Sequence, residues 1–286
     1  MTNVNEAATL ALVTSLIGYL AMSLGGGLGM YFGVGGAFEY LYYRRRRADA
    51  ECWKCQPRRW AAPALRRREL LLGTSNLTIA SLASGVLAHD IATTNHTAVY
   101  FGGAHGVAFS IAVTVFYFLA TDCGLYWAHR IFHHPVLFRS IHKTHHRNNT
   151  PSAFTSAAVH PVEFFIYQGI MMAPVFVLPL PVVGLIVVLV YQHWVALVDH
   201  SGVRLRSHLP WQPPPQFHDD HHAYFHVNYG QNLGLWDRIF GTWRRVGRRY
   251  GVEVFGGRGA PVDGAREVGL IDYGDGGERP REELAS

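Results

Sequence analysis

The chain has 286 residues, of which 49% are hydrophobic and only 16% are charged. This balance is typical of a membrane protein, whereas a mean hydropathy of +0.07 excludes a chain that is wholly embedded in lipid. The net charge is +5 at pH 7 and the pI is near 9.2, and the basic residues gather in loops. We therefore expect apolar spans that carry a large polar cap, with a membrane and no nucleic acid as partner.

Four apolar stretches run along the chain, at residues 7–41, 70–87, 98–120 and 164–198. A transmembrane helix needs about 20 predominantly apolar residues, so each of the first three stretches is adequate for one span. The fourth is too long for one helix and is interrupted by Pro179 and Pro181, and proline breaks a helix. The sequence thus predicts an all-α integral membrane protein with about four spans, the last two forming a hairpin.

A strongly basic loop separates the first two stretches, with ten Lys or Arg residues between Arg44 and Arg68. By the positive-inside rule this loop is cytosolic. Counting crossings from it places residues 89–97, which hold no Lys or Arg, on the far side and returns the third span to the cytosol. Because a hairpin leaves and comes back, all the histidine clusters beyond residue 128 are expected in a cytosolic helical cap.

Seventeen histidines occur, and eleven of them fall into five tight places beyond residue 128. Neutral imidazole is the commonest side-chain metal ligand. In an HxxHH run the histidines lie at i, i+3 and i+4, and on a helix these three point the same way. We therefore predict a metal site built from His129, His133, His134, His142, His145, His146, His160, His200, His218, His221 and His222.

The first cluster leaves one choice open. His129 and His133 share a helical face, while His134 is turned away by about 140° unless Pro135 ends the helix and redirects it. Both His133 and His134 therefore stay candidates. Side chains expected to orient the imidazoles from outside the metal site are Asp122, Asp199, Asp219 and His226.

So many imidazoles exceed the four ligands that usually satisfy one zinc, which implies two metals. Iron fits an all-nitrogen site of this size and carries oxygen chemistry, whereas magnesium and calcium prefer oxygen ligands. A neutral shell of imidazoles leaves two Fe ions their positive charge, which suits activation of O2. The sequence thus indicates an O2-dependent non-haem di-iron oxidoreductase.

The segments YWAHRIFHH, LFRSIHKTHH, AVHPVE, DHSG and FHDDHHAYFHVNYGQNLGLWDRIFGTW all lie between Asp122 and Trp243. Together they resemble the fatty acid hydroxylase and sterol desaturase superfamily of membrane di-iron enzymes. The resemblance implies metal binding by the predicted histidines, with either His134 or His133 from the first cluster and His160 as a contributor. It also implies electrons from NAD(P)H through cytochrome b5 and its reductase, which the basic loops 44–68 and 244–249 would dock by charge.

Within the superfamily, NYGQ at 228–231, LWDR at 235–238 and TPSAFTSAAVHPVE look like sterol 5-desaturases. In contrast, HSG at 200–202 and FGT at 240–242 look like 4-methylsterol oxidases. Both reactions stay open, because desaturation and hydroxylation share abstraction of a hydrogen as their first step. The expected function is desaturation or hydroxylation of a sterol in lipid biosynthesis, in the endoplasmic reticulum membrane if the organism is eukaryotic. The alternatives are hydroxylation of a fatty acyl or sphingolipid chain and, in another class, a non-catalytic metal-binding membrane protein.

Three parts are expected along the chain. Residues 1–69 would form the first span and the basic loop, and residues 70–250 would form the membrane di-iron hydroxylase or desaturase domain. Residues 251–286 are rich in Gly, Pro and charge and are expected to be disordered.

Overall fold

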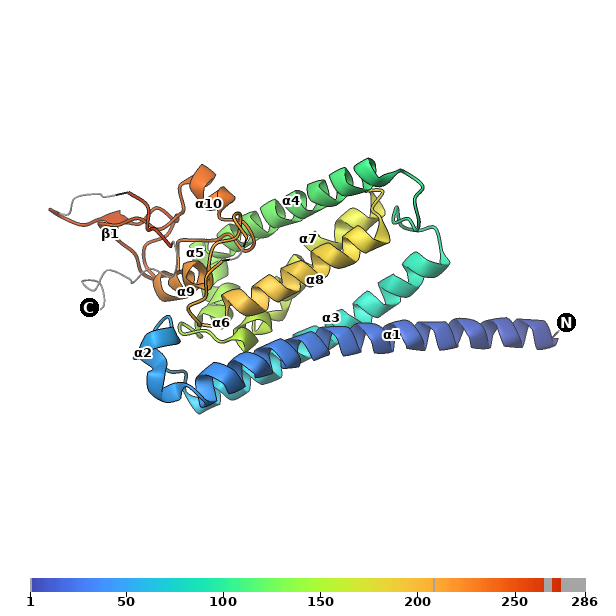
Figure 1. Ribbon diagram of the computed structural model, residues 1–286, viewed down its shortest axis with the longest axis horizontal. Helices are drawn as coiled ribbons and strands as arrows, with labels where there is room; N and C mark the ends of the chain where they lie inside the picture. Colours follow the sequence, from blue (N-terminus) through green and yellow to red (C-terminus); the bar gives the residue numbers. More distant parts are fainter. Residues whose placement is uncertain (1, 208, 265–268, 274–286) are drawn as a thin grey trace.

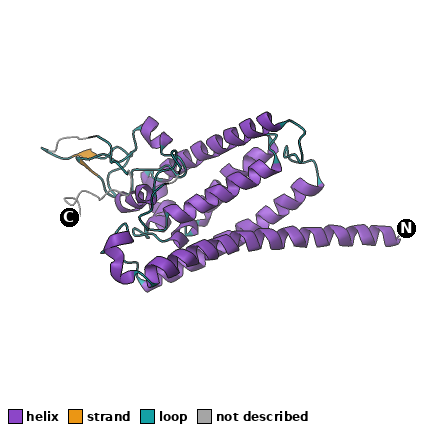
Figure 2. Cartoon of the chain, viewed as in Figure 1, coloured by secondary structure: helices purple, strands orange, loops and turns teal. Residues whose placement is uncertain are grey.

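Helices make up almost all of the regular structure (Figure 2). The computed structural model of the protein describes residues 2–207, 209–264 and 269–273. In this part the α-helices are α1 (Thr2–Phe38), α2 (Ala50–Trp53), α3 (Pro63–Thr93), α4 (Val107–Phe132), α5 (Pro135–Leu137), α6 (Lys143–His146), α7 (Pro161–Met172), α8 (Val182–Asp199), α9 (Pro215–Tyr224) and α10 (Leu235–Phe240). The π-helical turns are η1 (Glu39–Arg44) and η3 (Phe138–His142), and the 3-10 turns are η2 (Arg47–Asp49), η4 (Ala153–Ala157) and η5 (Ala173–Phe176). The short antiparallel strands β1 (Arg248–Arg249) and β2 (Ala260–Pro261) complete the described elements.

The long helices lie side by side as a stem, and the short elements gather as a cap at one end of it (Figure 1). Among the described residues, the helical segments long and apolar enough to cross a membrane are Thr9–Arg44, Pro63–Thr93, Val107–Phe132 and Val182–Asp199. The predicted all-α, multi-pass membrane fold is confirmed. α4 continues twelve residues beyond the apolar stretch that predicted it, and its last turns carry polar side chains into the cap.

The predicted hairpin is present as α7, η5 and α8, with Pro181 at the start of α8. Its first arm is short, because α7 has 12 residues and at 1.5 Å per residue is about 18 Å long. The arm is therefore shorter than the roughly 30 Å hydrocarbon core that a full span must cross. Both ends of the hairpin nevertheless lie at the cap, so His160 and His200 come to the same end of the stem (Figure 1).

The helix α1 packs along α3 at close range. A Cβ atom on Gly85 would lie 2.8 Å from the Cα of Leu20, which no side chain tolerates without a shift. Small residues allow such close backbone approach between helices in lipid. Beyond α1, the basic loop packs on the cap, where the buried Lys54 donates to Thr150 Oγ1 at 3.0 Å.

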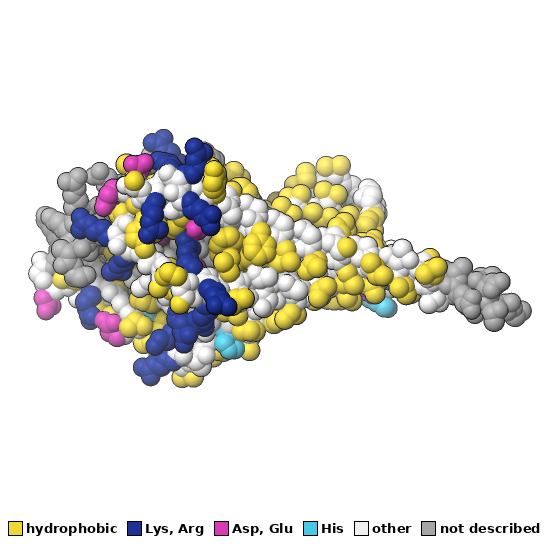
Figure 3. All heavy atoms as spheres, turned by 90° about the horizontal axis from the view of Figure 1, so that it is seen from below, with side chains coloured by type: hydrophobic (Ala, Val, Ile, Leu, Met, Phe, Trp, Pro, Cys, Tyr) yellow, Lys and Arg dark blue, Asp and Glu magenta, His cyan; other side chains and the backbone are white. Residues whose placement is uncertain are grey.

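Lys and Arg side chains gather over the cap end, while hydrophobic side chains cover much of the stem (Figure 3). In the segment expected to be disordered from residue 251, most described side chains are exposed or half-buried and a few are buried. Ile271 and Tyr273 are buried against Phe217 and Trp243, and the Tyr273 hydroxyl donates to Asp220 Oδ2 at 2.8 Å. These contacts hold Ile271 and Tyr273 on the cap, and disorder of the segment as a whole stays a prediction. Residues 265–268 and 274–286 lie outside the described residues.

Candidate metal centre

Histidines from four separate parts of the chain meet where the stem enters the cap. Two groups form, and within each group one ligand nitrogen per residue lies within 4.8 Å of the others. All of these side chains are buried. The first group is His129, His133, His142, His146 and His221, and the second group is His145, His200, His218 and His222.

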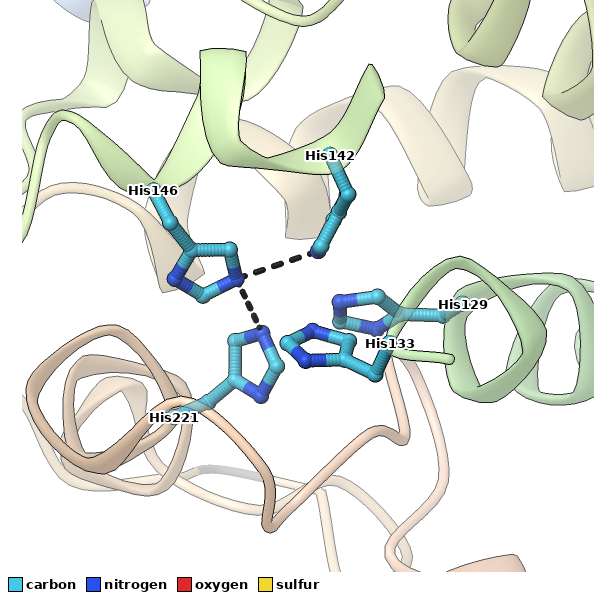
Figure 4. A group of neighbouring side chains, drawn as sticks. All are labelled: His129, His133, His142, His146 and His221. Atoms are coloured by element: carbon cyan, nitrogen blue, oxygen red, sulfur yellow. Dashed lines mark hydrogen bonds between the residues drawn. The ribbon is translucent and has the colours of Figure 1, made fainter. Parts of the chain in front are cut away.

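The first group is assembled from three directions (Figure 4). The end of α4 supplies His129 and His133, the η3–α6 turn supplies His142 and His146, and α9 supplies His221. The Nε2 atom of His146 lies 3.0 Å from that of His142 and 3.0 Å from that of His221. The rings thus turn their Nε2 atoms toward a common centre.

The second group is built around His200, the residue that follows α8. Its Nε2 atom lies 2.9 Å from the Nε2 atom of His218 and 3.2 Å from that of His145. His222 is fully buried beside them, and neither of its ring nitrogens has a hydrogen-bond partner among the described residues. A second centre of imidazole nitrogens therefore lies next to the first.

The outer nitrogens fix the protonation of several rings. Nδ1 of His129 lies 2.8 Å from the carbonyl oxygen of Tyr229, and Nδ1 of His221 lies 2.7 Å from that of Val227. Nδ1 of His200 lies 2.7 Å from the carbonyl oxygen of its helix neighbour one turn earlier. A carbonyl oxygen only accepts, so each Nδ1 carries the proton and donates it. The Nε2 atoms of these neutral rings are consequently bare, with lone pairs that point into the two centres.

His133 is oriented through another histidine. His226 Nε2 lies 2.9 Å from the carbonyl oxygen of Val252 and must donate to it, which leaves His226 Nδ1 as an acceptor. Burial lowers the pKa of His226 to about 4, so the ring is neutral at physiological pH. His133 Nδ1 therefore donates to His226 Nδ1 at 2.9 Å, and His133 Nε2 is left buried with no partner in the part of the chain that the structure describes. His226 has the contact expected of an orienting residue.

Glu163 is an orienting residue that the sequence analysis missed. Its Oε1 atom lies 2.6 Å from Nδ1 of His142, and both side chains are buried. The carboxylate accepts the Nδ1 proton, which keeps His142 Nε2 bare and raises its basicity as a ligand. One signal was available, because Glu163 is the single carboxylate in the apolar run that follows His160.

The electrostatics of the groups favour neutral ligands. Burial, reinforced by neighbouring imidazoles, holds the pKa of a set of rings outside the membrane spans well below the usual 6.5. That set is His145, His146, His218, His221 and His222. These rings therefore carry no charge at neutral pH, and the neutral ring is the form that binds metal.

The spacing of the nitrogens fits metal ions. Two nitrogens that bind one ion at about 2.1 Å and at right angles to each other lie about 3.0 Å apart. The Nε2 pairs are 2.9 to 3.2 Å apart. Each pair includes a ring whose Nδ1 carries the proton, namely His142, His200 or His221, so its Nε2 lone pair is available to a metal ion. Both groups can thus hold a metal ion, and imidazole donors suit transition metals rather than magnesium or calcium.

Each HxxHH run divides between the two groups. In the first run, His142 and His146 face the first group and His145 faces the second. In α9, His221 joins the first group, whereas His218 and His222 join the second. The prediction that all three histidines of a run point to one place was wrong. Residues i+3 and i+4 are about 100° apart around a helix, which directs them to either side of a line between two centres.

Two predicted ligands lie outside both groups. His134 is exposed at the start of α5, and the structure brings His133 rather than His134 into the first group. His160 is half-buried and caps α7, where its Nδ1 accepts from the backbone N–H of Val162 at 3.2 Å. The ring therefore caps the N-terminus of α7, the helix that carries Glu163.

The carboxylates expected to orient imidazoles have other surroundings. Asp122 accepts from Asn232 Nδ2 at 2.9 Å and from Trp236 Nε1 at 2.7 Å, so it holds the loop before α10 to α4 instead of a histidine. Asp219 accepts from Gln56 Nε2 at 3.3 Å, which ties α9 to the basic loop. Asp199 Oδ1 is buried and has no hydrogen-bond partner among the described residues.

A cavity in the stem leads to both groups. Its walls are mostly apolar and include Leu77, Leu125, Met171 and Leu197. At the cap end it is lined by members of the first group, His129 and His142, and of the second, His145, His200 and His218. An apolar molecule in this cavity would therefore lie against both centres.

Comparison with known proteins finds relatives of the region that holds the histidines. Residues 114–242 match the fatty acid hydroxylase family model, and this segment contains all members of both histidine groups. The Delta(7)-sterol 5(6)-desaturase of Saccharomyces cerevisiae is 36% identical over 141 residues, which cover 49% of this chain and 38% of the yeast protein. Lathosterol oxidase of Homo sapiens is 34% identical over 139 residues, covering 48% of this chain and 46% of the human protein.

Lathosterol oxidase of Mus musculus is 37% identical over 136 residues, covering 47% of this chain and 45% of the mouse protein. The match thus spans less than half the length of these curated relatives. No solved structure matches the chain.

Proposed function

We propose that this chain, which carries a fatty acid hydroxylase domain over residues 114–242, is a membrane-bound, O2-dependent di-iron oxidoreductase that desaturates a sterol. The observation that carries the proposal is the pair of neighbouring groups of buried imidazole nitrogens at the head of an apolar cavity. Sterol 5(6)-desaturation is the preferred reaction, because the yeast relative reported above has that activity in its name. Hydroxylation at a 4-methyl group is the alternative within the sterol class.

The two histidine groups would each hold one iron. When bound, the irons supply activation of O2 and removal of hydrogen from an unactivated carbon. The protein supplies orientation: Glu163 fixes His142, and His226 fixes His133, each by accepting the Nδ1 proton. Burial of both groups excludes water from the reaction, and the apolar walls hold the lipid with one carbon at the cap end of the cavity.

We also propose that the cap faces the cytosol and receives electrons from cytochrome b5, in the endoplasmic reticulum if the organism is eukaryotic. Residues 44–47, a run of four arginines, are exposed at the cap end, where an acidic carrier could dock (Figure 3). In the loop 244–249, Arg244 is buried and paired with Asp220 at 2.8 Å, so it is not available for docking.

A second candidate is hydroxylation of a fatty acyl or sphingolipid chain, which the name of the matched family favours. A non-catalytic metal-binding role is less well supported, because members of both groups line a cavity large enough to receive part of another molecule.

Sterol analysis in yeast separates these functions. The chain is expressed in one strain that lacks the sterol 5(6)-desaturase and in another that lacks the 4-methylsterol oxidase, and sterols are measured by mass spectrometry. Restoration of the 5(6)-unsaturated sterol in the first strain is expected. No change of sterols in either strain, with a new hydroxylated acyl chain, would favour the second candidate.

Metal analysis tests the centre itself. Purified protein is expected to contain two irons per chain, whereas a single zinc would contradict the proposal.

A further inference from the structure

Gln192 is a polar side chain in the middle of a candidate membrane span. It lies in α8, within the run VVGLIVVLVYQHWVALVD, and it is only 5% exposed. The side chain lines the cavity that leads to the histidine groups. Polar side chains at membrane depth are costly and commonly mark a functional site.

The hydrogen bonds of Gln192 determine which end of its amide is free. Thr121 Oγ1 donates its single proton to the carbonyl oxygen of Tyr117 at 2.9 Å, so towards other partners it can only accept. Gln192 Nε2 lies 3.0 Å from Thr121 Oγ1 and donates to it. The amide is thereby held with its nitrogen against α4 and its oxygen turned away. Gln192 Oε1 is buried and has no partner among the described residues.

An unpaired acceptor at this depth needs a donor from the molecule that fills the cavity. Leaving a buried acceptor unsatisfied costs about 1–3 kcal/mol, and the hydrocarbon core supplies no bulk water to satisfy it. Gln192 precedes His200 by eight residues, which is about 12 Å along the helix axis. A lipid that reaches from the metal centres to Gln192 can therefore offer it a polar group.

We propose that Gln192 is a specificity-determining residue that accepts a hydrogen bond from a free hydroxyl group of the lipid substrate. The proposal rests on the proposed function for the location of the substrate, and it deepens that function by naming the group recognised. Because Oε1 can only accept, a hydroxyl is recognised, and its methyl ether or ester is not. A site that pairs with a substrate hydroxyl discriminates strongly against the analogue that lacks the proton.

The test compares lathosterol with its 3-O-methyl ether on the full chain in lipid nanodiscs. Affinity is measured without turnover, by competition against a fluorescent sterol, and kcat/KM is measured separately. The wild-type protein is expected to prefer lathosterol by roughly 10- to 100-fold. Gln192→Met, which keeps the length but removes the acceptor, is expected to reduce this preference to less than about threefold. The matched control is Gln212→Met, since Gln212 is not among the residues that line the cavity and its replacement should keep the wild-type preference.

Two results would overturn the proposal: equal affinity of the wild-type protein for the lipid and its ether in both the sterol pair and the sphingoid pair, or an unchanged preference in Gln192→Met. Iron content and thermal unfolding of each variant show that it is folded. A sphingoid base and its O-methyl ether are measured in parallel. If that pair alone is discriminated and Gln192→Met abolishes the discrimination, the sterol function fails while the role of Gln192 stands. If neither pair is discriminated, the role of Gln192 fails.

Discussion

In several of the histidine rings, the Nδ1 atom has a hydrogen-bond partner outside the two groups, and the Nε2 atom points into one of the groups. The partners of the outer nitrogens are of three kinds: backbone carbonyls, a carboxylate in the case of His142, and a second imidazole in the case of His133. All three accept the Nδ1 proton, so they select the same tautomer. The two groups are therefore prepared for metal before any metal binds, which lowers the cost of ordering the ligands.

The first prediction separates His133 from its neighbour in sequence. His133→Ala should lower the iron content and reduce activity by about 100-fold or more, since losing a ligand exceeds the 10- to 100-fold cost of losing an orienting partner. His134→Ala is the matched control, because His134 is exposed outside the groups, and it should keep iron and activity. Loss of iron in His134→Ala with retention in His133→Ala would reverse the assignment.

The second prediction concerns Glu163. Glu163→Gln keeps the size of the side chain but removes the charge that orients His142, and we expect iron affinity to fall by roughly 10- to 100-fold. Iron affinity is measured by competition with a chelator. Glu253→Gln removes an exposed carboxylate paired with Arg249 and should leave iron affinity unchanged. Equal iron affinities of the two variants would show that Glu163 does not orient His142.

At the level of elements, the sequence pattern predicted the stem well and the division of the cap less well. The apolar stretches correspond to α1, α3, α4 and the α7–α8 hairpin. The apolar stretch alone stops short of the end of α4, because the last turns hold Asp122 and His129, which are buried in the cap and not in lipid. The helical spacing of His129 and His133 indicated this continuation. The spacing of residues along a helix shows which side of the helix they face, but it does not show that two metal centres lie on that side.

The same reasoning explains why Glu163 was missed while nine of the eleven predicted histidines meet in the groups. The histidines can be recognised in the sequence by their number and by their spacing within one helix. The partner of Glu163 is His142, 21 residues earlier and on another element, so the pair exists only after folding. A contact of this kind leaves no local pattern in a single sequence.

The third prediction is about the segment that returns to the cap after β2. The Tyr273 hydroxyl donates to Asp220 and accepts from Asn228 Nδ2 at 2.8 Å, and both partners are buried. Tyr273→Phe leaves them incompletely paired, at a cost of about 1–3 kcal/mol. At about 2–4 °C per kcal/mol for a chain of this size, the thermal unfolding midpoint should fall by several degrees. Tyr40→Phe, at an exposed tyrosine, should not move the midpoint.

At the level of the whole molecule, the buried imidazoles couple stability to pH. Their pKa values in the folded protein lie well below 6.5, whereas in the unfolded chain they return to that value. Below pH 6.5 the unfolded chain therefore binds protons that the folded protein does not, and folding stability falls as the pH falls. Metal binding acts in the same direction, because protons compete with the metal for the same nitrogens.

The fourth prediction follows from this linkage. The unfolding midpoint of the detergent-solubilised protein should change little between pH 8 and pH 7 and should fall steadily from pH 6.5 to pH 5. Metal-free protein should show the same direction with a smaller slope. His134→Ala removes an exposed histidine and should reproduce the wild-type profile. A midpoint that is constant down to pH 5, with or without metal, would contradict the neutral, buried state of these rings.

The orientation of the molecule in the membrane can be tested with the cysteines it contains. Cys52 is exposed in the basic loop at the cap end, whereas Cys55 is buried and Cys123 is half-buried in α4. In sealed microsomes the cytosolic face is outside, so a membrane-impermeant maleimide should label Cys52 without detergent. Cys52→Ser gives the background from the other two cysteines. In that background, Gly103→Cys at the opposite end of the stem should be labelled only after the membrane is permeabilised. The reverse pattern would place the histidine groups and the arginine run at residues 44–47 on the lumenal side, where a cytosolic electron carrier has no access to them.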